Sequence, residues 1–140
     1  MIGESDLRKL LTAMSPVLSS EEYIFCSLPA DYGDHQHLSP LASIKEAEGL
    51  SLVIPLSKAI QYHIEFDSSF KKITLNIHSS LNAVGLTAAV STQLAQTGIS
   101  ANILAGYFHD HIFVPTDKAQ LALNTLRVFS RDQSTDEGKP

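Results

Sequence analysis

The sequence is poor in the residues that stabilise secreted or membrane proteins. Cys26 is its single cysteine, so no intramolecular disulfide can form, and we expect a reducing, cytoplasmic environment. Tryptophan is absent, and no apolar run is long enough to span a membrane. The first residues also lack the basic start of a signal peptide, so no membrane partner is expected.

Positive charge is scarce as well. Ten basic residues stand against fifteen acidic ones, which gives a formal net charge of −5, and no Lys/Arg cluster stands out. A nucleic-acid partner is therefore not expected. The phosphate-binding glycine motifs and the nucleophile elbow of hydrolases are both missing. We therefore expect a protein that is not an enzyme and carries no cofactor.

What remains is a globular composition, with 44% hydrophobic and 18% charged residues. The spacing of apolar residues predicts helices over 5–18 and 83–97, a short helix from Ser57, and a last helix capped by Thr116 or Asp117. The segments predicted to be strands are 21–29, 41–47, 50–55, 72–78, 99–105 and 111–115. The turn-rich stretch between the first two strands is predicted to be a loop.

From residue 72 onward this order is β-α-β-β-α, which is a split βαβ unit without its last strand. The segment LVIPLSKA (52–59) aligns without gaps with IFVPTDKA (112–119), and each predicts a strand that ends in proline and leads into a helix. We therefore predict an α+β, ferredoxin-like fold of two related halves, with antiparallel sheets and helices on one face. The predicted boundaries are 1–66 for a degenerate N-terminal half, 67–130 for the C-terminal half and 131–140 for a disordered tail.

One long segment carries a family resemblance. HSSLNAVGLTAAVSTQLAQTGISANILAGYFHDHIFVP, followed by DKAQLALNTL, resembles an ACT domain. With YIFCSLP and EAEGLSLVI added, the chain resembles more closely a family of small, uncharacterised bacterial proteins with an ACT-like C-terminal half. It is also similar to the paired ACT domains of aspartokinases and cytosolic amino-acid sensors. The resemblance implies that the chain binds an amino acid, regulates another protein and forms a homodimer.

The predicted topology places the polar stretch FHDH at one end of a sheet. The first and third strands of a split βαβ unit are antiparallel neighbours, so the end of strand 72–78 should lie beside the start of strand 111–115. Alternation along the strands assigns one set of apolar residues to the helix side: Ile73, Leu75, Ile77, Ile112 and Val114. Counting back by twos from Ile112 puts Asp110 on that side too, near the N-terminus of helix 83–97. A helix N-terminus favours a carboxylate, and the Asp110 carboxylate favours a cation, so together they suit an α-amino acid.

Backbone N–H groups around Gly85 are predicted to hold the ligand carboxylate, because a glycine permits close approach. Gly85 is expected within the first helical turn, where glycine costs about 1 kcal/mol relative to alanine. An adjacent strand, of this or another subunit, should add two residues. The predicted ligand-binding residues are Ser80, Asn82, Ala83, Val84, Gly85, Leu86, Asn102, Ile103 and Asp110.

Two other interpretations stay open. The opposite face of the strands should carry His78, His109 and His111, which could form a metal site, although no fourth ligand is apparent. The chain could instead be a protein–protein interaction module without a ligand, in which case the space above Gly85 should be filled with apolar groups. Asp110 could also simply bond to its own turn.

Overall fold

The computed structural model describes residues 4–29, 32–77 and 85–137, and these divide into two compact units. Unit 1 consists of residues 1–19 and 72–140, and unit 2 of residues 20–71. Among the described strands, hydrogen-bonded neighbours follow the order β2-β3-β1-β4-β6-β5. None of the described helices is both long and apolar enough to cross a membrane.

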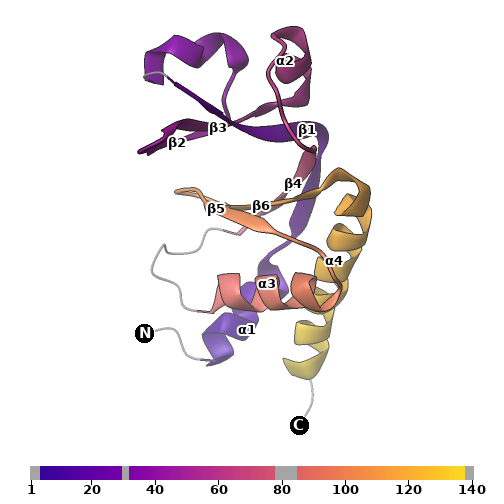
Figure 1. Ribbon diagram of the computed structural model, residues 1–140. Helices are drawn as coiled ribbons and strands as arrows, with labels where there is room; N and C mark the ends of the chain where they lie inside the picture. Colours follow the sequence, from indigo (N-terminus) through magenta and orange to yellow (C-terminus); the bar gives the residue numbers. More distant parts are fainter. Residues whose placement is uncertain (1–3, 30–31, 78–84, 138–140) are drawn as a thin grey trace. The chain divides into compact units, whose positions relative to one another are not determined.

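The described part of unit 1 contains three α-helices and several strands, and most of these elements come from the predicted C-terminal half. Its elements are α1 (Glu4–Ala13), the start of β1 (Pro16–Leu28), most of β4 (Phe70–Leu75), α3 (Leu86–Gln96), β5 (Asn102–Ala105), β6 (Asp110–Pro115), the 3₁₀ turn η2 (Thr116–Lys118) and α4 (Ala119–Glu137). Figure 1 shows α1, α3 and α4 on one side of β5 and β6. β5 and β6 pair antiparallel, with Ile103 opposite Ile112.

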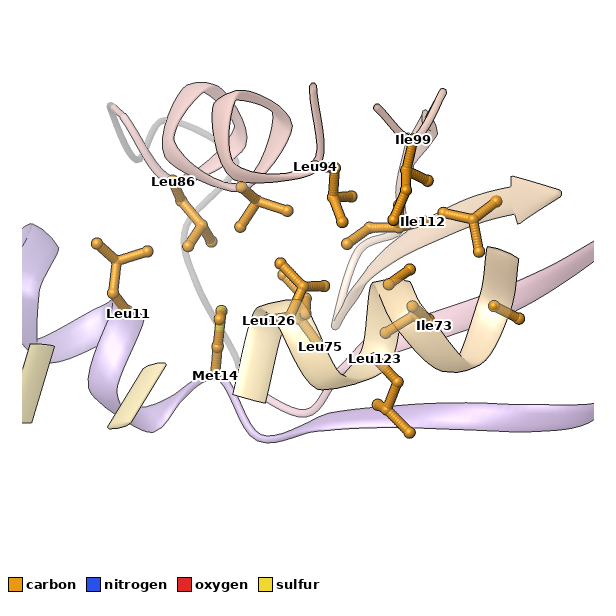
Figure 2. Close-up of a cluster of buried hydrophobic side chains, with 14 residues drawn as sticks. Leu11, Met14, Ile73, Leu75, Leu86, Leu94, Ile99, Ile112, Leu123 and Leu126 are labelled. Carbon is orange, nitrogen blue, oxygen red and sulfur yellow. The ribbon is translucent and has the colours of Figure 1, made fainter. Parts of the chain in front are cut away.

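The core of unit 1 lies between these helices and strands. The apolar residues of β4 and β6 that alternation assigned to the helix side, Ile73, Leu75, Ile112 and Val114, are all buried in it. Figure 2 shows leucines of α3 and α4 packed around Leu75, with Leu11 of α1 and Met14, which follows α1, at one end. The predicted strand faces are therefore confirmed for this unit.

Two elements of unit 1 begin or end away from their predicted positions. α1 stops at Ala13 rather than at residue 18, because Ser15 has a left-handed backbone (φ 41°) and Pro16 cannot continue a helix. β1 then starts at Pro16. α4 continues to Glu137, through most of the stretch predicted to be a disordered tail from 131 to 140. Its Ala122, Leu123 and Leu126 are buried, which ties the helix to the core.

In the described part of unit 2, β3 pairs antiparallel with both β1 and β2, and a small core forms beside them. The elements of this unit are the rest of β1, the 3₁₀ helix η1 (Tyr32–Leu38), β2 (Ala42–Glu46), β3 (Gly49–Pro55), α2 (Leu56–Gln61) and the first residues of β4. The predicted β2–β3 hairpin is confirmed, with Glu46 opposite Gly49 at its turn. η1 lies in the stretch predicted to be a loop, and its Leu38 is fully buried in the core of the unit.

The predicted internal repeat is visible in the backbone. Pro55 ends β3 with φ −60° and ψ 139°, and Pro115 ends β6 with φ −52° and ψ 139°. A helical segment follows each proline directly, and the matched alanines, Ala59 and Ala119, are both buried. The α+β, ferredoxin-like fold class predicted from the sequence is thus confirmed.

Candidate functional site

The HDH stretch forms the turn between β5 and β6 and the first residues of β6. The Gly106 N–H donates to the His109 carbonyl over 2.9 Å, which closes the turn. A Cβ at Gly106 would lie 2.8 Å from the same oxygen, so only glycine fits there. Asp110 is then the first residue of β6, half-buried and opposite Ala105.

Strand alternation places Asp110 on the same side of β6 as Ile112, which belongs to the core under the helices. The carboxylate therefore lies at the edge of the helix-covered side, as predicted. His111 and Phe113 occupy the other side, and Phe113 is fully buried.

On that other side, His111 contacts β4. Its Nδ1 lies 2.9 Å from the Thr74 hydroxyl, within hydrogen-bonding distance. Burial lowers the pKa of His111 below its ordinary value of 6.5, and the charge of Lys72 lowers it further. His109 also lowers this pKa, whereas Asp110 raises it. The net effect favours a neutral imidazole at pH 7.

Thr74 and Lys72 were not among the predicted residues, although the pattern could have supplied them. The alternation that buries Ile73 and Leu75 places Thr74 and Lys72 on the opposite face, where His111 was expected. Because β4 and β6 are neighbours in the sheet, Thr74 then lies beside His111.

One predicted ligand of the metal site, His78, lies outside the described residues. Within the described ranges, no group of three or more His, Cys, Asp and Glu side chains is placed to hold a metal ion. His109 has a buried Nδ1 atom without a hydrogen-bond partner. Positive charge on the His109 ring lowers the pKa of His111, so these two imidazoles lie near each other.

The described N-terminus of α3 differs from the prediction in one respect. Gly85 is not within the first helical turn but precedes it, with a left-handed backbone at φ 98°. A Cβ on Gly85 would lie 3.0 Å from the Cδ2 methyl of Leu7, a residue of α1. The glycine is thus required by its own φ and by the packing of Leu7, which fills the space predicted to be open to a ligand.

The other predicted ligand contacts fall in three places. Leu86 begins α3 with its side chain buried in the core, so only its backbone could meet a ligand. Asn102 and Ile103 are neighbours on β5 and therefore face opposite sides, Asn102 exposed and Ile103 packed against the core. Four predicted residues lie outside the described part of the chain: Ser80, Asn82, Ala83 and Val84.

The ACT domain family matches residues 2–71 and again residues 66–128. The chain belongs to the ACT domain family. Its two ACT matches support a regulatory role that depends on binding a small ligand. No curated protein matches the chain.

Solved structures agree with the ACT assignment. A protein of unknown function from Vibrio cholerae, described as a possible transport protein, is 48% identical, with a TM-score of 0.83 over 90% of this chain and 97% of that one. The ligand-free regulatory subunit of aspartate kinase from Thermus thermophilus is 12% identical, with a TM-score of 0.57 over 82% and 96%. A protein of Agobacterium tumefaciens is 16% identical, with a TM-score of 0.59 over 79% and 82%. The last two show a shared fold only.

Proposed function

We propose that this ACT protein binds an α-amino acid at the end of unit 1 where β6 begins, and that binding changes its association with a protein partner. The position of Asp110 carries the proposal. A half-buried carboxylate at the start of a strand, on the helix side, can pair with an ammonium group. The ligand carboxylate would then meet free N–H groups at the start of α3.

Leu7 restricts how such a ligand can enter. Its methyl group covers the side of Gly85 where a Cβ would stand, so the ligand cannot approach from that direction. Contacts with Ser80, Asn82, Ala83 and Val84 are part of the proposal, as is a contribution from Asn102. Asn102 is exposed on β5, the last strand in the hydrogen-bonded order, and could face a ligand held by a second copy of the chain.

We propose a homodimer for the same reason. An end strand offers unpaired N–H and C=O groups to another chain. β5 (NILA) contains no charged residue and no proline, which are the residues that usually protect such an edge.

A thermal-shift screen of metal-free protein against the twenty amino acids tests the ligand. A ligand present at about one hundred times its Kd should stabilise the protein by ~2.7 kcal/mol. Asp110→Ala should abolish the shift. Asp67→Ala, which removes an exposed aspartate of unit 2, is the matched control and should preserve it. A shift that survives Asp110→Ala would refute the assigned role of this carboxylate.

The packing of Leu7 against Gly85 favours a second candidate, a ligand-free interaction module. In that case, none of the amino acids should shift the melting temperature. Light scattering after gel filtration would still show self-association, or association with a partner, that does not change with added ligand.

A further inference from the structure

A second feature of unit 1 lies away from Asp110. An open hollow of about 570 Å³ is formed by the end of α1, the start of β1 and residues 127–131 of α4. Its volume falls within the range of ~300–1,000 Å³ that is usual for small-molecule sites. The residues that line it include Thr12, Ser15, Pro16, Arg127, Ser130 and Arg131.

The frame of the hollow is held in place by hydrogen bonds. The hydroxyl of Ser130, which is a buried polar residue, donates to the backbone carbonyls of Leu11 (2.7 Å) and Thr12 (3.0 Å) at the end of α1. The Ser15 carbonyl accepts the N–H of Asn76 over 3.4 Å. Because Pro16 has a fixed φ and is buried, this part of the lining needs little reorganisation to accept a ligand.

The charge of the hollow contrasts with that of the chain. The sequence holds three arginines, Arg8, Arg127 and Arg131, within a net charge of −5, and two of them line this hollow. Arg127 and Arg131 are four residues apart on α4, so they stand on the same side of the helix with Cβ atoms roughly 5–6 Å apart. Two guanidinium groups at this spacing can both reach the oxygens of one anion.

We propose that this hollow binds the phosphate group of a small phosphorylated molecule. A phosphate monoester carries a charge of about −1.5 to −2 at pH 7, which two guanidinium groups can balance. Each planar guanidinium can donate two parallel hydrogen bonds to phosphate oxygens, which a lysine cannot do. The site differs in place and in ligand charge from the amino-acid site proposed above.

The position of Arg127 and Arg131 has a competing explanation, which is that they stabilise the C-terminal end of α1. The last turn of α1 contains no basic residue, and the C-terminal end of a helix attracts positive charge. In that case, the arginines would stabilise the fold but give no response to phosphate beyond that of ionic strength. The test must therefore measure binding and stability separately.

The experiment is a titration of the full chain with inorganic phosphate, followed by amide chemical shifts and by melting temperature, at ionic strength held constant with chloride. We expect saturable shifts around the end of α1 and in α4. The double variant Arg127→Gln/Arg131→Gln should lose them, and Arg127→Lys/Arg131→Lys should bind phosphate more weakly although its charge is unchanged. Arg8→Gln, which removes an arginine that does not line the hollow, should retain them.

Three outcomes would overturn the proposal. Phosphate could have no effect beyond that of chloride, or Arg8→Gln could weaken binding as much as the double variant. Succinate at the same ionic strength could also match phosphate, which would mean a general attraction of anions. Asp110→Ala should leave the phosphate response intact, so a failure of the amino-acid proposal would not be mistaken for a failure here.

Discussion

Replacement of Gly85 by alanine is a direct test of how the N-terminus of α3 is built. Gly85 has φ 98°, and the space where its Cβ would stand meets the Cδ2 methyl of Leu7 at 3.0 Å. Two costs therefore arise together, one from the backbone conformation and one from contact with α1. The contact cost would be absent if this glycine were retained only for a ligand, whereas the backbone cost would remain.

The two costs can be given magnitudes. A left-handed backbone costs a non-glycine residue roughly 1–2 kcal/mol. Overpacking in a core costs about 1–3 kcal/mol, and the lower end applies here because Leu7 can shift its terminal methyl. Alanine has less conformational freedom than glycine in the unfolded chain, which offsets the destabilisation by roughly 0.4–1 kcal/mol. We therefore expect Gly85→Ala to lower the free energy of unfolding by about 1–2.5 kcal/mol.

Urea denaturation of Gly85→Ala beside Gly98→Ala separates the two costs. Gly98 also has a left-handed backbone (φ 78°), but nothing lies within 4 Å of its Cβ position. Gly98→Ala should thus show the backbone cost alone, and adding Leu7→Ala to Gly85→Ala should relieve the contact cost. If Gly85→Ala were no more destabilising than Gly98→Ala, Leu7 would not pack against this turn and the space would be open to a ligand.

Two further changes test other contacts of unit 1. Ser130→Ala leaves the Leu11 and Thr12 carbonyls without their donor and should destabilise the protein by about 1–3 kcal/mol in urea, whereas Ser91→Ala, a half-buried serine of α3, should cost far less. The pKa of His111 is lower in the folded protein than in the unfolded chain, so its neutral form contributes stability above about pH 6.5 that is lost as the pH falls. The free energy of unfolding should therefore fall between pH 7 and pH 5, and His111→Gln should reduce that slope; an unchanged slope would mean that His111 titrates normally.

Strand faces were predictable because they depend on local alternation. Once Ile73 and Ile112 are assigned to the core, the sides of Thr74, Asp110 and His111 follow from a period of two. The β2–β3 hairpin was predictable because a turn signal at Glu48-Gly49 stands between two strand-like runs, although the structure places the turn one residue earlier, at Ala47-Glu48, and pairs Gly49 with Glu46. These features need no knowledge of distant parts of the chain.

The contacts made by α1 could not be predicted in this way. Leu7 meets Gly85 across 78 positions of sequence, and the Ser130 hydroxyl meets Leu11 across 119. Nothing in the local pattern of α1 says which helix it packs against. The sequence therefore indicated that Gly85 needed an explanation, and only the fold showed that α1 supplies a large part of it.

The internal repeat shows how two similar sequences can lead to different structures. Both copies end a strand at a proline with nearly the same backbone angles and bury the matched alanine in the helical segment that follows. After Ala59, however, α2 ends within two residues at Gln61, and His63 takes a left-handed backbone, whereas Ala119 begins a helix of 19 residues. Because α4 is this long, its residues Arg127, Ser130 and Arg131 reach the end of α1. The six-residue helix α2 is too short to contain residues equivalent to these three. The repeated segments, 52–59 and 112–119, therefore determine how each helix starts. The residues that follow them determine the length of each helix, and only α4 is long enough to line the hollow that we propose for phosphate.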